Sequence, residues 1–296
     1  MSYQPRRVPR TGECTLRGLR HRVLRWGPAD APPLVFLHGW ADAAATYQFL
    51  VDAFRADLPI LALDWRGFGE SAWTHAPYWF PDYLADLEAL LDTVSPGAPA
   101  TLVGHSMGGN VAALYGGIRP ERVRAVVNLE GFGLKRTAAE EAPARYRRWL
   151  DELKAPPAFG RYRSQAEFAT MLARRNTRLT PERARFVAEC WTRAAADGQF
   201  EVRADPAHKL VNPVLYRREE AEACWRECRA PVLMVFGGES EFRGLLGPDG
   251  TDAYFAALYP NATFATLPGA GHMLHHEVPD ALAHLVEPWL ERHAGA

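Results

Sequence analysis

Apolar residues along the chain gather in short continuous runs that end at turns. Such runs cover residues 33–37, 59–63, 100–103, 123–129, 231–236 and 263–267. Runs of about four to eight residues that are apolar without regular alternation are typical of strands buried on both faces, as in a parallel sheet. Two further β-rich segments precede them, at residues 14–17 and 21–26. We expect these segments to form one sheet.

Amphipathic segments with helical spacing lie between the predicted strands. They cover residues 46–54, 83–94, 110–118 and 282–290. An alternation of strand and helix predicts an α/β domain whose sheet is mostly parallel and whose connections are right-handed.

Residues 134–228 break this alternation. The segment is rich in arginine, alanine and glutamate, has helical spacing and lacks a strand signal. A segment of this length is not a loop inside a compact domain. We therefore predict a helical cap inserted after the sixth strand, with residues 1–133 and 229–296 forming the core domain.

The composition is that of an ordinary globular protein of 296 residues, with 48% hydrophobic and 23% charged residues. The formal net charge of -1 argues against nucleic-acid binding, which favours a basic excess. No apolar run reaches the roughly 18 residues that a membrane span needs, and the first residues lack the apolar core of a signal peptide. The four cysteines are too scattered for a disulfide framework. These features predict a cytoplasmic protein without nucleic-acid or membrane partners.

The strongest chemical signal is Gly104-His105-Ser106-Met107-Gly108, placed directly between a predicted strand and a predicted helix. A nucleophilic serine needs a tight turn that lifts its hydroxyl out of the sheet. Small residues two positions before and after it let the backbones pass closely. The following helix contributes its positive end and the free N–H of Met107. The pattern predicts Ser106 as a nucleophile.

With this turn in place, the sequence resembles the α/β-hydrolase superfamily over nearly its whole length. The other shared motifs are His38-Gly39-Trp40, residues 64–71 and residues 269–279, each after a predicted strand. The resemblance implies a mostly parallel eight-stranded sheet flanked by helices, with the cap inserted after strand 6. It also implies a serine hydrolase.

The resemblance also assigns roles to individual residues. His272 matches the general base, and the backbone N–H groups of Trp40 and Met107 match the oxyanion hole. His38 matches the structural histidine before the glycine of the oxyanion loop. His105 is the variable residue of the five-residue motif around Ser106.

A metal site is not expected. His275 and His276 lie close to His272, but no other closely spaced ligands accompany them.

The acid that would orient His272 is ambiguous in the sequence. Many relatives carry an aspartate three residues after a glycine that follows the seventh strand; here that count reaches Ser240 or Glu241. Some relatives instead carry a glutamate after the sixth strand, where this chain has Glu130. We favour Glu130, because a carboxylate at a buried strand end needs a partner such as an imidazolium. Glu241 is the alternative, and Glu239 ranks behind it.

The predicted function is hydrolysis of a small, moderately apolar carboxylic ester through an acyl-enzyme on Ser106, without a cofactor. Hydrolysis of a carbon–carbon bond or a lactone, and a receptor-like role with little turnover, remain open alternatives. A serine at position 106 excludes the dehalogenases and epoxide hydrolases of this fold, which use an aspartate there. The sequence predicts a small-molecule partner and leaves the substrate and the oligomeric state undetermined.

Overall fold

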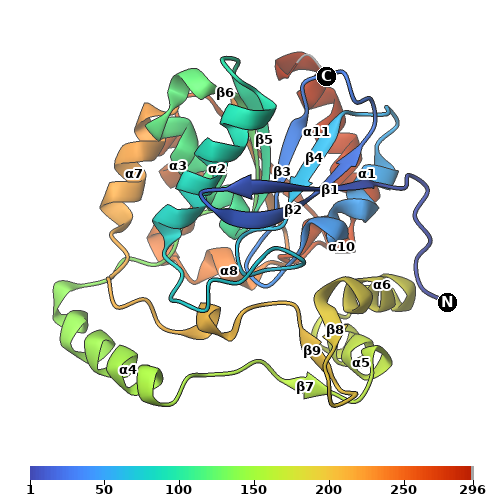
Figure 1. The fold of residues 1–296 in the computed structure, drawn as a ribbon. Coiled ribbons are helices and arrows are strands. Elements are labelled where there is room, and N and C mark those ends of the chain that lie inside the picture. The colour runs from blue at the N-terminus through green and yellow to red at the C-terminus, as the bar shows by residue number, and fades with distance from the viewer. Residues whose placement is uncertain (295–296) are drawn as a thin grey trace.

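The computed structural model describes residues 1–294, and its centre is an eight-stranded sheet (Figure 1). All strand pairs from β4 to β11 are parallel, while β1–β2 and β2–β4 are antiparallel. The prediction of a mostly parallel eight-stranded sheet is therefore confirmed. In spatial order the strands are β1 (Arg10–Leu16), β2 (Leu19–Trp26), β4 (Ile60–Leu63), β3 (Leu34–Leu37), β5 (Ala100–His105), β6 (Val123–Leu129), β10 (Val232–Gly237) and β11 (Ala262–Leu267).

Alternate residues of the central strands face opposite sides of the sheet, and both sides are covered. Val35 and Leu37 join one apolar core, whereas Leu34 and Phe36 join the other. All four residues of β3 are buried, as expected of a strand with helices on both faces.

Two helical layers provide these cores. On one face lie α2 (Phe80–Val94), α3 (Met107–Ile118), α7 (Arg218–Glu227) and α9 (Asp252–Leu258); on the other lie α1 (Gln48–Ala53), α10 (Leu274–Glu277) and α11 (Pro279–His293) (Figure 1). The short α8 (Glu241–Gly244) follows β10. Single turns of 3-10 helix occur at η1 (Ala44–Tyr47), η2 (Pro120–Arg122), η3 (Ala139–Glu141), η4 (Pro206–Lys209) and η5 (Gly247–Gly250).

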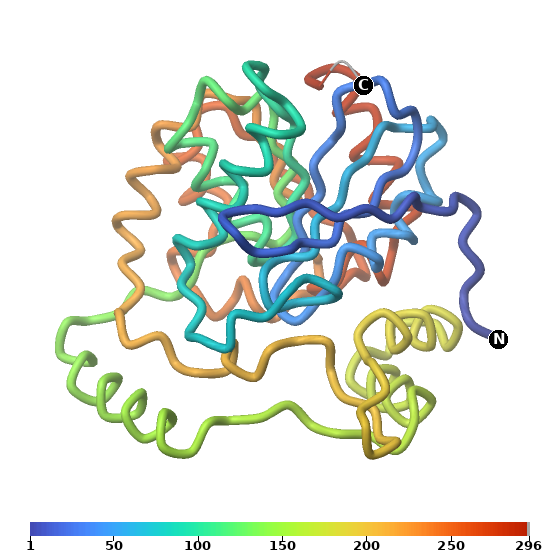
Figure 2. The backbone as a smooth tube through the Cα atoms, in the orientation of Figure 1, coloured from blue at the N-terminus to red at the C-terminus, as the bar shows by residue number. Residues whose placement is uncertain are grey.

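Most of residues 134–228 forms a separate layer below the carboxyl ends of the strands (Figures 1 and 2). It contains α4 (Ala142–Lys154), α5 (Gln165–Arg175) and α6 (Pro181–Trp191), with a small apolar core between α5 and α6. The segment was expected to be helical throughout. The structure adds a three-stranded antiparallel sheet of β7 (Arg161–Tyr162), β9 (Phe200–Val202) and β8 (Thr192–Ala194). These strands are too short to produce a periodic signal in the sequence.

The last helix of that segment packs in the core layer. α7 lies against α3, and the contact is close enough that a Cβ at Gly117 would fall 1.7 Å from the carbonyl oxygen of Cys224. The four cysteines are free. Within residues 1–294, no helix has both the length and the apolarity that a membrane span requires.

We expect Gly117→Ala to destabilise the protein, because the added methyl group would push α7 away from α3. Overpacking of a close contact costs about 1–3 kcal/mol, and urea unfolding should show a lower midpoint with an unchanged slope. The matched control is Gly244→Ala, whose Cβ would meet nothing within 4 Å. It should change the free energy of unfolding by less than about 0.5 kcal/mol. Equal losses in the two variants would contradict the close-packing argument.

Candidate functional site

Ser106 lies on a strained turn between β5 and α3. Its φ and ψ of 50° and -111° are unusual for a residue with a side chain. Glycines make the turn possible: a Cβ at Gly104 would lie 2.3 Å from the Gly108 carbonyl oxygen, and one at Gly108 would lie 2.0 Å from that of Leu37. The turn therefore has the geometry that the five-residue motif predicts.

His272 reaches Ser106 from the loop between β11 and α10. Its Nε2 lies 3.0 Å from the Ser106 Oγ, although the two residues are 166 positions apart. His105 holds the backbone of this loop, because its Nε2 lies 2.8 Å from the His272 carbonyl oxygen and donates to it. The sequence indicated no role for His105 beyond the variable position of the five-residue motif around Ser106. The structure corrects this, since His105 is buried and supports His272 directly.

Glu130 completes a chain of hydrogen bonds at the end of β6. Its Oε2 lies 3.0 Å from the His272 Nδ1. The Gly237 N–H donates to Oε1 at 2.7 Å, and the Ser240 hydroxyl donates to Oε2 at 2.5 Å. Glu130 is only 2% exposed, so these contacts satisfy a carboxylate that water does not reach freely.

The other two glutamates considered for this role lie elsewhere. Glu241 is exposed at the start of α8, and within residues 1–294 no hydrogen bond or ion pair joins it to His272. Glu239 pairs with Arg178. Ser240 occupies the position at which many relatives would carry the acid, and here it donates to Glu130 instead.

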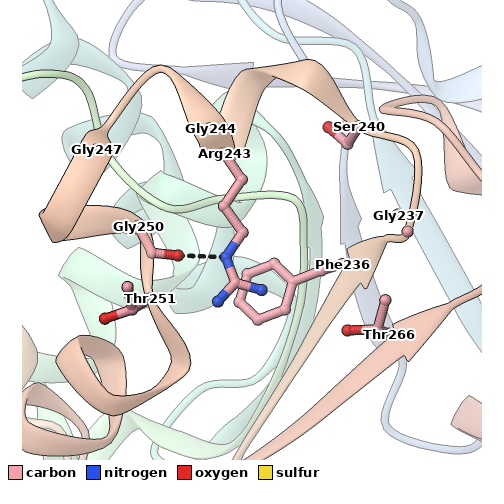
Figure 3. Close-up of a pocket in the computed structure, with 10 residues that line it drawn as sticks. Phe236, Gly237, Ser240, Arg243, Gly244, Gly247, Gly250, Thr251 and Thr266 are labelled. Atoms are coloured by element: carbon pink, nitrogen blue, oxygen red, sulfur yellow. Dashed lines mark hydrogen bonds between the residues drawn. The ribbon is translucent and has the colours of Figure 1, made fainter.

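Arg243 holds the segment that carries Ser240 (Figure 3). Its guanidinium lies 3.9 Å from the centroid of the Phe236 ring, its Nε donates to the Gly250 carbonyl, and it pairs with Asp252. Ser240 and Arg243 border a cavity of about 310 Å³. This anchoring keeps the loop after β10 in place beside Glu130.

The backbone segments that carry Trp40 and Met107 lie next to Ser106. A Cβ at Gly39 would lie 3.3 Å from the Ser106 Cβ, so the loop before Trp40 lies directly against the serine. Met107 is the first residue of α3. Among residues 1–294, neither N–H has a hydrogen-bond acceptor. Both donors therefore remain free to bind a negatively charged oxygen.

His38 fixes the loop that carries Trp40. Its Nε2 accepts a hydrogen bond from the Trp65 N–H at 3.0 Å, so the proton is on Nδ1, which donates to the Gly39 carbonyl at 2.7 Å. Burial lowers the pKa of His38, which keeps the ring neutral. The structural role expected for His38 matches these contacts.

Two half-exposed aromatic side chains belong to the segments that border the site. Trp40 is 48% exposed. Its ring centroid lies 5.9 Å from that of Phe159, a residue of the segment predicted to be the cap. Phe242, which is 51% exposed, lies with its ring centroid 4.4 Å from that of His272. The sequence contained no signal for Phe242, because only the fold of the loop after β10 brings it to the histidine.

A second group of histidines lies next to this site. His275 and His276 are buried, and Asp42 from the loop after β3 joins them, with its Oδ2 lying 3.2 Å from the His275 Nε2. The expectation of no metal site rested on the absence of another nearby ligand. In the structure Asp42, which is 233 positions from His275 in the sequence, is such a potential ligand.

Comparison with known proteins agrees with the fold. The family described as alpha/beta hydrolase fold matches residues 32–279. A serine hydrolase-like protein of Danio rerio is 26% identical over 90% of this chain and 83% of its own length. An sn-1-specific diacylglycerol lipase of Mus musculus is 24% identical over 89% of this chain and 82% of its own.

Solved structures show the same fold. A hypothetical protein of Pseudomonas aeruginosa superimposes with a TM-score of 0.84 at 25% identity, covering 95% of this chain and 99% of the other.

We expect Ser240→Ala to reduce turnover, because Glu130 would lose a charge-assisted hydrogen bond. Such a bond contributes about 1.5–3 kcal/mol, so kcat for a reaction at Ser106 should fall about tenfold or more while KM changes little. Ser240→Thr, which keeps a hydroxyl, is the matched control and should retain most of the activity.

A stricter test moves the acid to position 240. In a Glu130→Gln background, Ser240→Asp should restore part of the lost kcat, since Ser240 and His272 contact the same carboxylate oxygen. A folded double variant no more active than Glu130→Gln alone would show that position 240 does not face His272.

Proposed function

The chain belongs to the alpha/beta hydrolase family, as its motifs predicted, and on that premise we propose that it is a serine hydrolase that cleaves carboxylic esters. The single observation that carries the proposal is the continuous contact from Ser106 through His272 to Glu130, at 3.0 Å for each step. A nucleophile, a base and an orienting acid in this arrangement are the components of acyl transfer.

The reaction begins with attack of the Ser106 oxygen on the ester carbonyl while His272 takes the serine proton. Glu130 stabilises the resulting imidazolium, and the N–H groups of Trp40 and Met107 bind the tetrahedral oxyanion. The proton then passes from His272 to the departing alcohol, leaving an acyl group on Ser106. A water molecule that gives its proton to His272 attacks this acyl group, and His272 passes the proton to the Ser106 oxygen as the carboxylic acid is released.

The surroundings of Ser106 favour a small, moderately apolar substrate. Trp40 and Phe242 are each about half exposed; Phe242 packs on His272, and Trp40 follows Gly39, which lies against Ser106. Phe159 contacts Trp40 from the predicted cap, which would let this segment influence which acyl groups enter. The names of related proteins, a serine hydrolase-like protein and a lipase, support ester chemistry.

The predicted acid can be tested by two matched substitutions. We expect Glu130→Gln to lower kcat by about 10³–10⁴-fold, because the amide no longer stabilises the imidazolium. Glu241→Gln should stay within about twofold of the parent protein, since Glu241 is exposed. The reverse result, with activity kept in Glu130→Gln and lost in Glu241→Gln, would transfer the role to Glu241.

The proposed activity can be tested with p-nitrophenyl esters of increasing acyl length and a fluorophosphonate probe. We expect rapid labelling of Ser106, hydrolysis that is fastest for short to medium acyl chains, and loss of both in Ser106→Ala. Hydrolysis that persists in Ser106→Ala would contradict the proposal. Labelling without turnover of any ester would favour the receptor-like alternative.

A further inference from the structure

Three potential metal ligands meet beside the proposed active site without taking part in it. Asp42 lies in the loop after β3, and His275 and His276 are consecutive residues of α10. All three side chains are at most 2% exposed. One ligand atom from each lies within 4.8 Å of the others.

The spacing of these atoms is close to that of a tetrahedral metal site. The Asp42 Oδ2 lies 3.2 Å from the His275 Nε2 and 3.7 Å from the His276 Nε2. Ligand atoms that each bind zinc at about 2.0–2.1 Å are about 3.4 Å apart in a tetrahedron. Small movements of the two rings would therefore satisfy the coordination distances.

The hydrogen bonding of the cluster leaves ligand atoms unused. The His276 Nε2 is buried and has no hydrogen-bond partner within residues 1–294, and neither has the His275 Nδ1. Buried polar nitrogens are almost always paired, so such atoms call for an explanation. A metal ion would engage the His276 Nε2. At His275 it would bind Nε2, so the His275 proton would move to Nδ1, which would stay without a partner.

The outer contacts of Asp42 resemble the support that metal-binding carboxylates receive. Its Oδ1 accepts hydrogen bonds from the Thr46 hydroxyl at 2.6 Å and from the Trp191 indole at 2.8 Å. These bonds fix the carboxylate and leave Oδ2 facing the two histidines.

We propose that Asp42, His275 and His276 form a binding site for a divalent transition metal such as Zn²⁺. Two imidazoles and one carboxylate are a ligand set that suits this class of metal, whereas Mg²⁺ and Ca²⁺ prefer oxygen ligands.

Metal binding at this cluster would affect the proposed active site. The His275 ring lies 4.5 Å from that of His105, measured between ring centroids, and His105 donates to the His272 carbonyl. α10 begins at Leu274, two residues after His272. Drawing the ligand atoms together would shift α10, and we expect this to lower kcat for ester hydrolysis with little change in KM. This consequence rests on the proposed function, whereas binding itself does not.

The test is titration of the metal-stripped full chain with Zn²⁺. Calorimetry measures binding, and thermal unfolding measures the change in stability. We expect one equivalent to bind and the unfolding temperature to rise, and Co²⁺ to give visible absorption bands of a four-coordinate site. His276→Gln and Asp42→Asn should each weaken binding at least tenfold. His284→Gln, which changes an exposed histidine of α11, is the matched control and should bind normally. Circular dichroism checks that each variant is folded.

A variant at the proposed active site separates the two possible locations of the metal. Zn²⁺ binding should persist in His272→Gln, which removes the proposed base and leaves the cluster intact. Binding that disappears in His272→Gln but persists in folded His276→Gln would overturn the proposal, as would the absence of any binding by the parent protein. Because these measurements need no substrate, they stand even if ester hydrolysis is not found.

Discussion

The structure depends on a carboxylate that is buried at the carboxyl end of β6. An unpaired charge in this position would cost several kcal/mol, so the loops around Glu130 must supply partners. Gly237 and Ser240 do so from the loop after β10, and His272 does so from the loop after β11. One buried group thereby ties together the ends of three neighbouring strands, and the orientation of His272 toward Ser106 follows from it.

Two residues with strained backbone lie at the same edge of the sheet. Ser106 and Glu130 both have positive φ values, 50° and 58°, at the ends of adjacent strands. Each costs conformational free energy that the surrounding packing must offset. Hydrogen bonds between strands restrain both positions: the Ser106 N–H donates to the Leu129 carbonyl, and the Glu130 N–H donates to that of Val235. The side chains are thus held in place by the sheet before any substrate arrives.

A second line of contacts connects this edge with the segment 134–228. It runs from His272 through His105 and His275 to Asp42, and the Trp191 indole on α6 donates to Asp42. Each step is a packed or hydrogen-bonded contact, so a change at either end has a physical route to the other. This arrangement places the proposed metal site between the predicted cap and the proposed base.

The amino-acid sequence by itself predicted the sheet, the turn at Ser106 and His272 as the candidate base, because each is encoded by local periodicity or by a short motif. Tertiary structure brought Glu130 rather than Glu241 into contact with His272. The pairing of β6 with β10 also places the loop after β10 against Glu130. Tertiary structure also decided the small sheet of β7 to β9, whose strands of two or three residues are stabilised by pairing rather than by local propensity. Asp42 and His275 are 233 residues apart, so their contact could not be predicted from spacing along the chain, because only folding brings them together.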